Sequence, residues 1–254
     1  METIPVTPVL VRQDNYVWLF PTAPDQMAAV DPGEAEPVMA FLDRHDLGLS
    51  HILITHHHSD HIAGVEPLRQ RYQARVTGAA ADRHRLPTLD HAVVDGDRLS
   101  LGDQSVTVMA TPGHTLGHVV YQVGDALFSG DTLFPAGCGR LFEGSAGQMW
   151  HSLQKLMALP DDCRLFAGHE YTLLNLGFVR ILEPDHQAIT DFWQQAQQQV
   201  RQGLPTLPVA LAQEKQLNPF LRCHQPDIAQ RLGLAGQSAE VVFAALRERR
   251  NQHY

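Results

Sequence analysis

The sequence predicts a layered α/β body followed by a helical C-terminal region, and two patterns support this. Over the first two thirds of the 254 residues, short apolar runs alternate with segments whose apolar residues recur at helical spacing, and Gly, Pro and Asp turn signals separate them. From about Tyr171 onward the strand pattern fades and helical patterns dominate. In layered α/β proteins, functional side chains gather where strands end.

The N-terminal half contains expected strands and helices in alternation. Apolar, partly β-branched runs predict strands at Val6–Val11, Tyr16–Phe20, Met27–Val30 and Ser50–Thr55. Helical spacing predicts helices at Glu34–His45 and Val65–Tyr72. Pro67 places the start of the second helix, because proline suits a first helical turn and disrupts an interior.

Strands return between Ala92 and Asp131, in "SVTVMA", "HVVYQV" and "ALFSG", and a helix at Gln148–Leu159 precedes a last strand, "CRLFAGH". Beyond it, "DHQAITDFWQQAQQQVRQG" and "SAEVVFAALRERRN" are helical and the Pro-rich "LPTLPVAL" joins them. We therefore divide the chain into residues 1–172 and a helical domain of residues 173–254.

Composition narrows the class of protein. The formal net charge of −9 is unfavourable for a nucleic-acid binder, which usually has a basic face. Three widely spaced cysteines make a poor disulfide framework and fit a reducing compartment. The N-terminus lacks the pattern of a secretory signal, and no apolar run reaches the ~18 residues that a membrane span needs. We expect a cytoplasmic protein that binds neither nucleic acid nor membrane.

The stretch "THHHSDHIAG" follows the strand that ends at Thr55. In an extended segment residues two apart point the same way, so His56 and His58 share a side and the histidine between them points away. Asp60 continues the alternating set, and His61 starts the next turn. Imidazoles at this spacing suit zinc, iron or manganese. The alternative is a polar loop in which Ser59 or Asp60 caps the next helix.

Three further side chains each follow an apolar strand: His114 in "TPGHTLGH", Asp131 in "FSGDTLF" and His169 in "LFAGHEYT". Alone, each is more often a turn or capping residue than a ligand. Together they can converge at one sheet edge, as a site requires. His118 begins a strand, and we interpret it as structural or as a partner of a metal-bound imidazole.

These motifs resemble a known family. "THHHSDH" matches the T-H-x-H-x-D-H signature of the metallo-β-lactamase superfamily, and "TPGHTLGH", "GDTLF" and "GHEYT" match its later ligand motifs in order. Within that superfamily the chain closely resembles glyoxalase II, the hydroxyacylglutathione hydrolases. The closer match rests on "GCGRLFEG", "GHEYTLLNLGF", "NPFLR" and the helical C-terminal region.

The resemblance implies a four-layer αββα sandwich with a C-terminal helical domain that completes the substrate site. It also implies two divalent metal ions per chain, with zinc expected and iron or manganese as alternatives. The implied ligands are His56, His58 and His114 for the first ion and Asp60, His61 and His169 for the second, with Asp131 as the bridge. Asp60 and Asp131 are the expected catalytic residues.

The implied reaction is hydrolysis of S-(2-hydroxyacyl)glutathione, foremost S-D-lactoylglutathione to D-lactate and glutathione, the last step of methylglyoxal detoxification. A hydroxide bridging two metal ions is available near neutral pH because the cations lower the pKa of water. A thiol with a pKa near ~8.5 leaves without a strong general acid. The sequence therefore needs no catalytic Ser, Cys or Lys. We expect a monomer.

The substrate contacts come from the resemblance. Arginines at the end of a helix favour its dipole and need no ligand, so the run "LRERRNQHY" alone leaves its role open. The resemblance implies that Arg247 and Arg250 contact the glutathione carboxylates, together with Arg140 and Tyr171. Phe142 stands where many members have Tyr, so a hydroxyl donor is missing while its packing role remains.

Other functions share parts of these motifs. A persulfide dioxygenase would use one iron, and other hydrolases of the superfamily act on lactones, β-lactams or RNA. A module that binds metal or glutathione without catalysis is a further alternative, although a purely structural site rarely needs two open ions. Cys138 is either structural or a nucleophile, and we favour the structural role because no partner that would stabilise a thiolate is evident.

Overall fold

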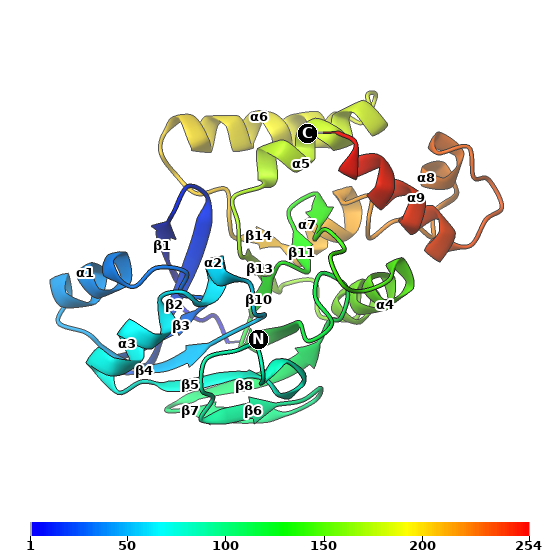
Figure 1. The fold of residues 1–254 in the computed structure, drawn as a ribbon. Coiled ribbons are helices and arrows are strands. Elements are labelled where there is room, and N and C mark those ends of the chain that lie inside the picture. The colour runs from blue at the N-terminus through cyan, green and yellow to red at the C-terminus, as the bar shows by residue number, and fades with distance from the viewer. Residues whose placement is uncertain (1, 254) are drawn as a thin grey trace.

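The computed structural model describes residues 2–253, and two six-stranded sheets form its centre (Figure 1). The first sheet has the order β1 (Thr7–Val11), β2 (Asn15–Ala23), β3 (Gln26–Val30), β4 (Gly48–Leu53), β5 (Arg75–Ala79) and β6 (His91–Val93). The second has the order β14 (Val209–Ala210), β13 (Arg164–Ala167), β10 (Ala126–Gly130), β9 (Val119–Val123), β8 (Gln104–Ala110) and β7 (Arg98–Leu101). The sheets are the two inner layers of the fold.

Helices cover the first sheet because its later strands are parallel. β1, β2 and β3 pair antiparallel, whereas β3, β4, β5 and β6 pair in parallel. Parallel neighbours need a crossover connection, and α1 (Glu36–Arg44) and α3 (Val65–Tyr72) lie in the crossovers before β4 and β5. Figure 1 shows both helices along the outer side of this sheet. The predicted αββα sandwich is confirmed.

Strand β2 shows how the layers pack. Trp18 and Phe20 point into the core between the sheets, where Phe20 stacks on Phe128 of β10 with ring centroids 5.3 Å apart. Val17 and Leu19 point to the other face and join the core beneath α1 and α3. Because side chains alternate along a strand, a strand covered on both faces is apolar throughout.

The C-terminal region contributes to the second sheet, which the sequence did not predict. Its helices are α5 (Thr172–Leu182), α6 (Gln187–Arg201), α7 (Leu211–Leu217), α8 (Pro226–Arg231) and α9 (Ala239–Asn251). Between α6 and α7, β14 pairs antiparallel with β13, so "CRLFAGH" is not the last strand. Two residues are too few to show an alternating pattern. No helix among residues 2–253 is long and apolar enough to span a membrane.

A short hairpin follows Asp131 and precedes α4 in the chain. It consists of β11 (Leu133–Phe134) and β12 (Gly137–Cys138). α4 (Ala146–Met157) has Ser145 as its N-cap, and the Ser145 side chain accepts a hydrogen bond from the Gln148 backbone N–H in a capping box. The η1 turn (Ala80–Asp82) is a single 3₁₀ turn after β5.

Glu214 of α7 anchors the β11–β12 hairpin through hydrogen bonds. Its carboxyl is fully buried and accepts hydrogen bonds from the Ala136 N–H at 2.8 Å and from Asn218 Nδ2 at 2.9 Å. Asn218 Nδ2 also donates to the Phe134 and Gly137 carbonyls. Burial raises the pKa of Glu214 from 4.5 to about 7, against the effect of these hydrogen bonds.

Glu214→Gln should stabilise the protein above neutral pH. As pH rises from 4.5 towards 7, the unfolded state loses the Glu214 proton while the folded state keeps it, so stability is lost over this window. At pH 8 the buried carboxylate lowers the free energy of unfolding by on the order of 3 kcal/mol, because the pKa of Glu214 rises from 4.5 to about 7 on folding. Urea unfolding at pH 5 and pH 8 measures it. The exposed Glu66→Gln is the control, and a gain at pH 8 no larger than at pH 5 would contradict this role.

Candidate metal centre and substrate pocket

Seven side chains meet at one edge of the two sheets, and each follows a strand or the turn after it. The strands that precede them are β4 for His56, His58, Asp60 and His61, β8 for His114, β10 for Asp131 and β13 for His169. Candidate ligands that follow the ends of packed strands are well placed to hold one fixed arrangement.

The backbone of the histidine stretch differs from the extended form that we expected. Alternation ends at His58, because Ser59–Ile62 forms the short helix α2, and Asp60 and His61 reach the site from a helical turn. No side chain caps this helix, so the capping alternative is wrong. His57 points away, as predicted, and its Nδ1 lies 3.1 Å from Asp82 Oδ2.

The first group consists of His56, His58 and His114. His58 Nδ1 lies 3.0 Å from His56 Nε2 and 3.0 Å from His114 Nε2. Ligand atoms about 2.1 Å from a tetrahedral zinc ion are about 3.4 Å from each other. The three nitrogen atoms are therefore spaced closely enough to hold one ion.

The second group consists of Asp60, His61 and His169. The two Nε2 atoms are 3.2 Å apart, and Asp60 Oδ2 lies 3.5 Å from His61 Nε2 and 3.4 Å from His169 Nε2. Asp131 lies between the groups: its Oδ2 is 3.4 Å from His114 Nε2 and its Oδ1 is 3.6 Å from His61 Nε2. Its carboxylate therefore faces both groups.

The two groups fit metal cations, because the nitrogen and oxygen atoms that face inward carry free lone pairs. The Nδ1 atoms of four histidines lie against an oxygen: Thr55 Oγ1 for His56, Asp31 Oδ2 for His61, the Arg140 carbonyl for His114 and Asp14 Oδ1 for His169. These oxygens assign the proton to Nδ1 and leave the Nε2 lone pair inside. Asp131 Oδ1 is buried and has no hydrogen-bond partner.

The pKa values separate the two groups. Burial, together with neighbouring histidines, lowers the pKa of His58 to about 4 and keeps His56 and His114 below their usual range. Burial also opposes the charge on His61 and His169, but the neighbouring carboxylates, Asp131 foremost, together outweigh it and raise their pKa values to about 10 and 11. The first group thus presents neutral imidazoles, and the second lies where positive charge is strongly favoured.

Asp31 also lies at the site, and sequence reasoning missed it. It accepts hydrogen bonds from the Thr55 N–H at 2.7 Å and from Thr55 Oγ1 at 2.6 Å, and it lies 3.0 Å from His61 Nδ1. Asp31 therefore contacts His61 of the second group directly and His56 of the first group through Thr55. Asp31 directly follows β3, so the strand-end pattern that identified His114 also applied to it.

His118 also has a structural place. Its Nδ1 lies 3.0 Å from Thr111 Oγ1 and 3.1 Å from Thr132 Oγ1, and its Nε2 accepts the Asp131 N–H at 3.1 Å. It therefore fixes the backbone of Asp131. Both ring nitrogens are engaged outside the two groups, in agreement with the predicted role as a structural residue.

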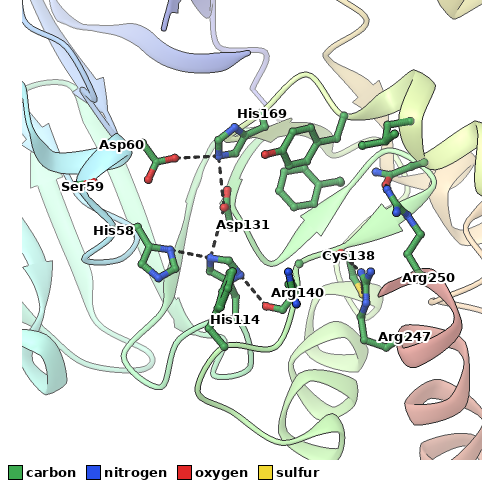
Figure 2. A pocket seen from close by; sticks show the side chains of 16 residues that line it. His58, Ser59, Asp60, His114, Asp131, Cys138, Arg140, His169, Arg247 and Arg250 are labelled. Carbon is green, nitrogen blue, oxygen red and sulfur yellow. Dashed lines mark hydrogen bonds and ion pairs between the residues drawn. The ribbon is translucent and has the colours of Figure 1, made fainter. Parts of the chain in front are cut away.

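A pocket of about 490 Å³ extends from the metal-ligand groups to α9. Figure 2 shows His58, Asp60, His114, Asp131 and His169 on one side and Arg247 and Arg250 on the other. All five predicted substrate residues line it: Arg140, Phe142, Tyr171, Arg247 and Arg250. The structure also places Phe134, Leu174 and Asn175 in its wall, which the sequence did not indicate.

Aromatic rings border the ligand histidines. Tyr171 stacks on His169 with centroids 4.7 Å apart and planes at 8°. Phe142 packs edge-on against His58 and His114, at 5.4 Å and 5.2 Å, while 60% of its surface stays exposed. The Arg140 guanidinium lies 5.5 Å from the Phe142 ring.

The far end of the pocket is cationic. Arg247 is 5% exposed, and its Nη1 donates to the Cys138 carbonyl at 2.7 Å, while its buried Nε has no partner. Its hydrogen-bond partners within residues 2–253 are the carbonyl and, at 3.9 Å, the Sγ of Cys138. A nearby anion stabilises a buried guanidinium, so this end of the pocket suits an anionic group. Arg250 Nη2 lies 3.4 Å from Asn175 Oδ1.

Cys138 lines the pocket but is poorly suited to act as a nucleophile. Burial raises the pKa of its thiol, although the Arg247 guanidinium opposes this. Its Sγ lies 3.9 Å from Arg247 Nη1. A thiol that stays protonated at neutral pH is a weak nucleophile, which supports the structural role.

Comparisons with known proteins agree with this geometry. Residues 28–169 match the Metallo-beta-lactamase superfamily, and residues 170–253 match the Hydroxyacylglutathione hydrolase C-terminus. The chain is 47% identical to a hydroxyacylglutathione hydrolase of Rhodobacter capsulatus, over 98% of this chain and 99% of that one. It is 46% identical to hydroxyacylglutathione hydrolase 2 of Vibrio vulnificus, over 94% and 95% of the two chains.

A solved structure shows the same architecture. The crystal structure of ETHE1 from Myxococcus xanthus superposes with a TM-score of 0.67 at 28% identity, covering 96% of this chain and 90% of that one. The fold and its His/Asp clusters define a metal-dependent hydrolase of the metallo-β-lactamase superfamily. Near-full-length identity of 46–47% then narrows the class, and the chain belongs to the hydroxyacylglutathione hydrolase family.

Proposed function

We propose that the protein hydrolyses S-(2-hydroxyacyl)glutathione thioesters, with S-D-lactoylglutathione as the main substrate and D-lactate and glutathione as products. The observation that carries this is the arrangement of the pocket. The His and Asp side chains suited to bind cations lie at one end, and the buried Arg247 lies at the other. A thioester with a carboxylate-bearing thiol half matches both ends. The names of the relatives support the same substrate class.

The centre is proposed to hold two divalent ions, zinc by preference over iron or manganese. His56, His58 and His114 would hold one ion, and Asp60, His61 and His169 the other, with the Asp131 carboxylate shared between them. Imidazole and carboxylate ligands suit all three metals. When bound, the ions supply a hydroxide nucleophile near neutral pH and positive charge for the oxyanion.

The chain's own residues would position the substrate. Arg247 and Arg250 would bind the glutathione carboxylates, because a charged hydrogen bond in a buried site is strong. Arg140 and Tyr171 would hold the peptide part near the ligands, and Phe142 would shield the thioester from solvent by covering His58 and His114. The thiolate leaves without a protein acid, since its pKa is near ~8.5.

Purified protein with S-D-lactoylglutathione tests this function. We expect release of free glutathione, loss of the activity after treatment with a chelator and its return when zinc is added. Release that persists without metal would contradict the mechanism. Oxygen uptake with glutathione persulfide, in place of thioester hydrolysis, would favour the dioxygenase alternative.

Phe142→Tyr should tighten substrate binding. The new hydroxyl would lie on the pocket wall and offer a donor to the glutathione backbone, worth about 0.5–1.5 kcal/mol. We expect KM to fall by about 2- to 10-fold while kcat changes little. Steady-state kinetics on both proteins measure this, and an unchanged or higher KM would show that the substrate does not reach this position.

We further propose that the protein acts as a monomer in the cytoplasm, with residues 1–172 carrying the metal centre and residues 173–254 forming the helical domain that completes the pocket. All three cysteines are buried and unpaired, which supports a reducing compartment. Light scattering should give a mass near 28.2 kDa. A mass twice that value would contradict the monomer.

A further inference from the structure

The last residue of the β1–β2 turn, Asp14, and the first residue of β2, Asn15, contact two of the three residues in the second group. Asp14 Oδ1 lies 3.0 Å from His169 Nδ1. Asn15 Nδ2 donates to Asp60 Oδ2 at 3.1 Å and to the Asp60 carbonyl at 3.3 Å, and it lies 3.4 Å from His169 Nε2. Asn15 is only 5% exposed. Two adjacent residues therefore hold ligands that arrive from different parts of the fold.

Backbone hydrogen bonds fix this turn against the segment that carries His169. The Tyr16 N–H donates to the Gly168 carbonyl at 2.9 Å, and the Glu170 N–H donates to the Asp14 carbonyl at 2.8 Å. These bonds lie on either side of Asn15, which itself bridges to His169. The side chains of Asp14 and Asn15 are thus presented to the second group in fixed positions.

The first group is held by other partners. His56 Nδ1 lies 3.0 Å from Thr55 Oγ1, and His114 Nδ1 lies 2.8 Å from the Arg140 carbonyl. Among the described residues, no hydrogen bond joins the β1–β2 turn to this group. The turn consequently acts on one of the two groups and not on the other.

The outer side of the second group is also less packed. A hollow of about 350 Å³ lies behind Asp60 and His169, and residues 12–15 form one of its walls together with Tyr171. Tyr171 stacks on the His169 ring from another side, whereas Asp14 and Asn15 supply hydrogen-bond partners that fix the orientation of His169 and Asp60 on the side of this hollow.

We propose that Asp14 and Asn15 are positioning residues that set the affinity of the second metal ion, independently of the first. This inference rests on the proposed two-ion centre. Asp14 accepts the Nδ1–H of His169 and so keeps the Nε2 lone pair directed inward. Asn15 fixes the carboxylate oxygen of Asp60 that faces the group. Partners of this kind typically change metal affinity by about 10- to 100-fold.

The experiment measures ions rather than turnover. Wild type, Asp14→Ala, Asn15→Ala and the control Asp25→Ala, an exposed residue of the β2–β3 turn, are equilibrated with a zinc-buffering chelator. Elemental mass spectrometry then counts the ions per chain across free zinc concentrations. We expect the second ion to bind about 10- to 100-fold more weakly in the two turn variants, with the first ion changed less than about 3-fold.

Each outcome decides a separate point. Turn variants that bind both ions as wild type does, or that lose both in parallel, would overturn the inference. A wild-type chain that binds a single ion would contradict the two-ion proposal itself. If circular dichroism shows that an alanine variant is unfolded, Asp14→Asn replaces it. That variant keeps an oxygen for His169 and should weaken the second ion by only a few-fold, and no selective weakening would again overturn the inference.

Discussion

Asp131→Ala should abolish thioester hydrolysis, with kcat lower by on the order of 10³-fold or more, the scale expected when a central catalytic group is lost. The Asp131 carboxylate lies between the two groups, with Oδ2 3.4 Å from His114 Nε2 and Oδ1 3.6 Å from His61 Nε2. Its removal takes a ligand from each proposed ion at once. Steady-state kinetics and an ion count on the same sample measure the effect.

The exposed turn residue Asp103 provides the control, because Asp103→Ala removes the same charge far from any ligand. Asp131→Ala should also bind fewer ions than this control. An Asp131→Ala protein with both ions and activity within tenfold of wild type would show that the carboxylate is not shared. The mechanism would then need another bridge.

Arg247→Met should raise KM by about 10- to 100-fold, with a smaller effect on kcat, because a hydrogen bond to a charged group contributes about 1.5–3 kcal/mol. Methionine keeps an apolar side chain and removes the guanidinium, whose Cζ lies 5.3 Å from the Phe220 ring centroid. The substitution should weaken the binding of the glutathione half of the substrate and leave metal binding unchanged. The ion count should therefore equal that of wild type.

A thioester of a thiol without carboxylates separates charge recognition from general damage. If Arg247 binds a glutathione carboxylate, this substrate should react equally slowly with wild type and with Arg247→Met. An equal fractional loss on both substrates would contradict the proposed contact. Free glutathione should also inhibit the variant less than wild type, by a factor similar to the change in KM.

The elements with strong local patterns were predictable from the sequence. The helix Val65–Tyr72 and the strand Ala126–Gly130 have the expected bounds, because apolar spacing and a proline or glycine mark their ends. β14 was missed because its two residues pair with β13, more than forty positions earlier. Pairing at that distance leaves no local signal. The helical entry of Asp60 was missed because four residues are too short for a helical period.

In the site, too, most of the residues with a local sequence pattern were predicted and those without one were missed. The strand-end positions of His114, Asp131 and His169 indicated convergence, and the resemblance supplied their grouping. Residues that orient the ligands were missed. Asp14 ends a polar turn and Asn15 begins β2, and their contacts with Asp60 and His169 arise only when the fold brings these segments together. Contacts between segments that are distant in sequence leave no local pattern from which they could be predicted.

The central claim is a two-ion centre at one end of the pocket, and element-resolved anomalous scattering from a crystal tests it most directly. We predict two metal peaks per chain, one among His56, His58 and His114 and one among Asp60, His61 and His169, with Asp131 between them. Data on either side of the zinc, iron and manganese edges would identify each ion. A single peak per chain, or a second peak outside the Asp60, His61 and His169 group, would contradict the account.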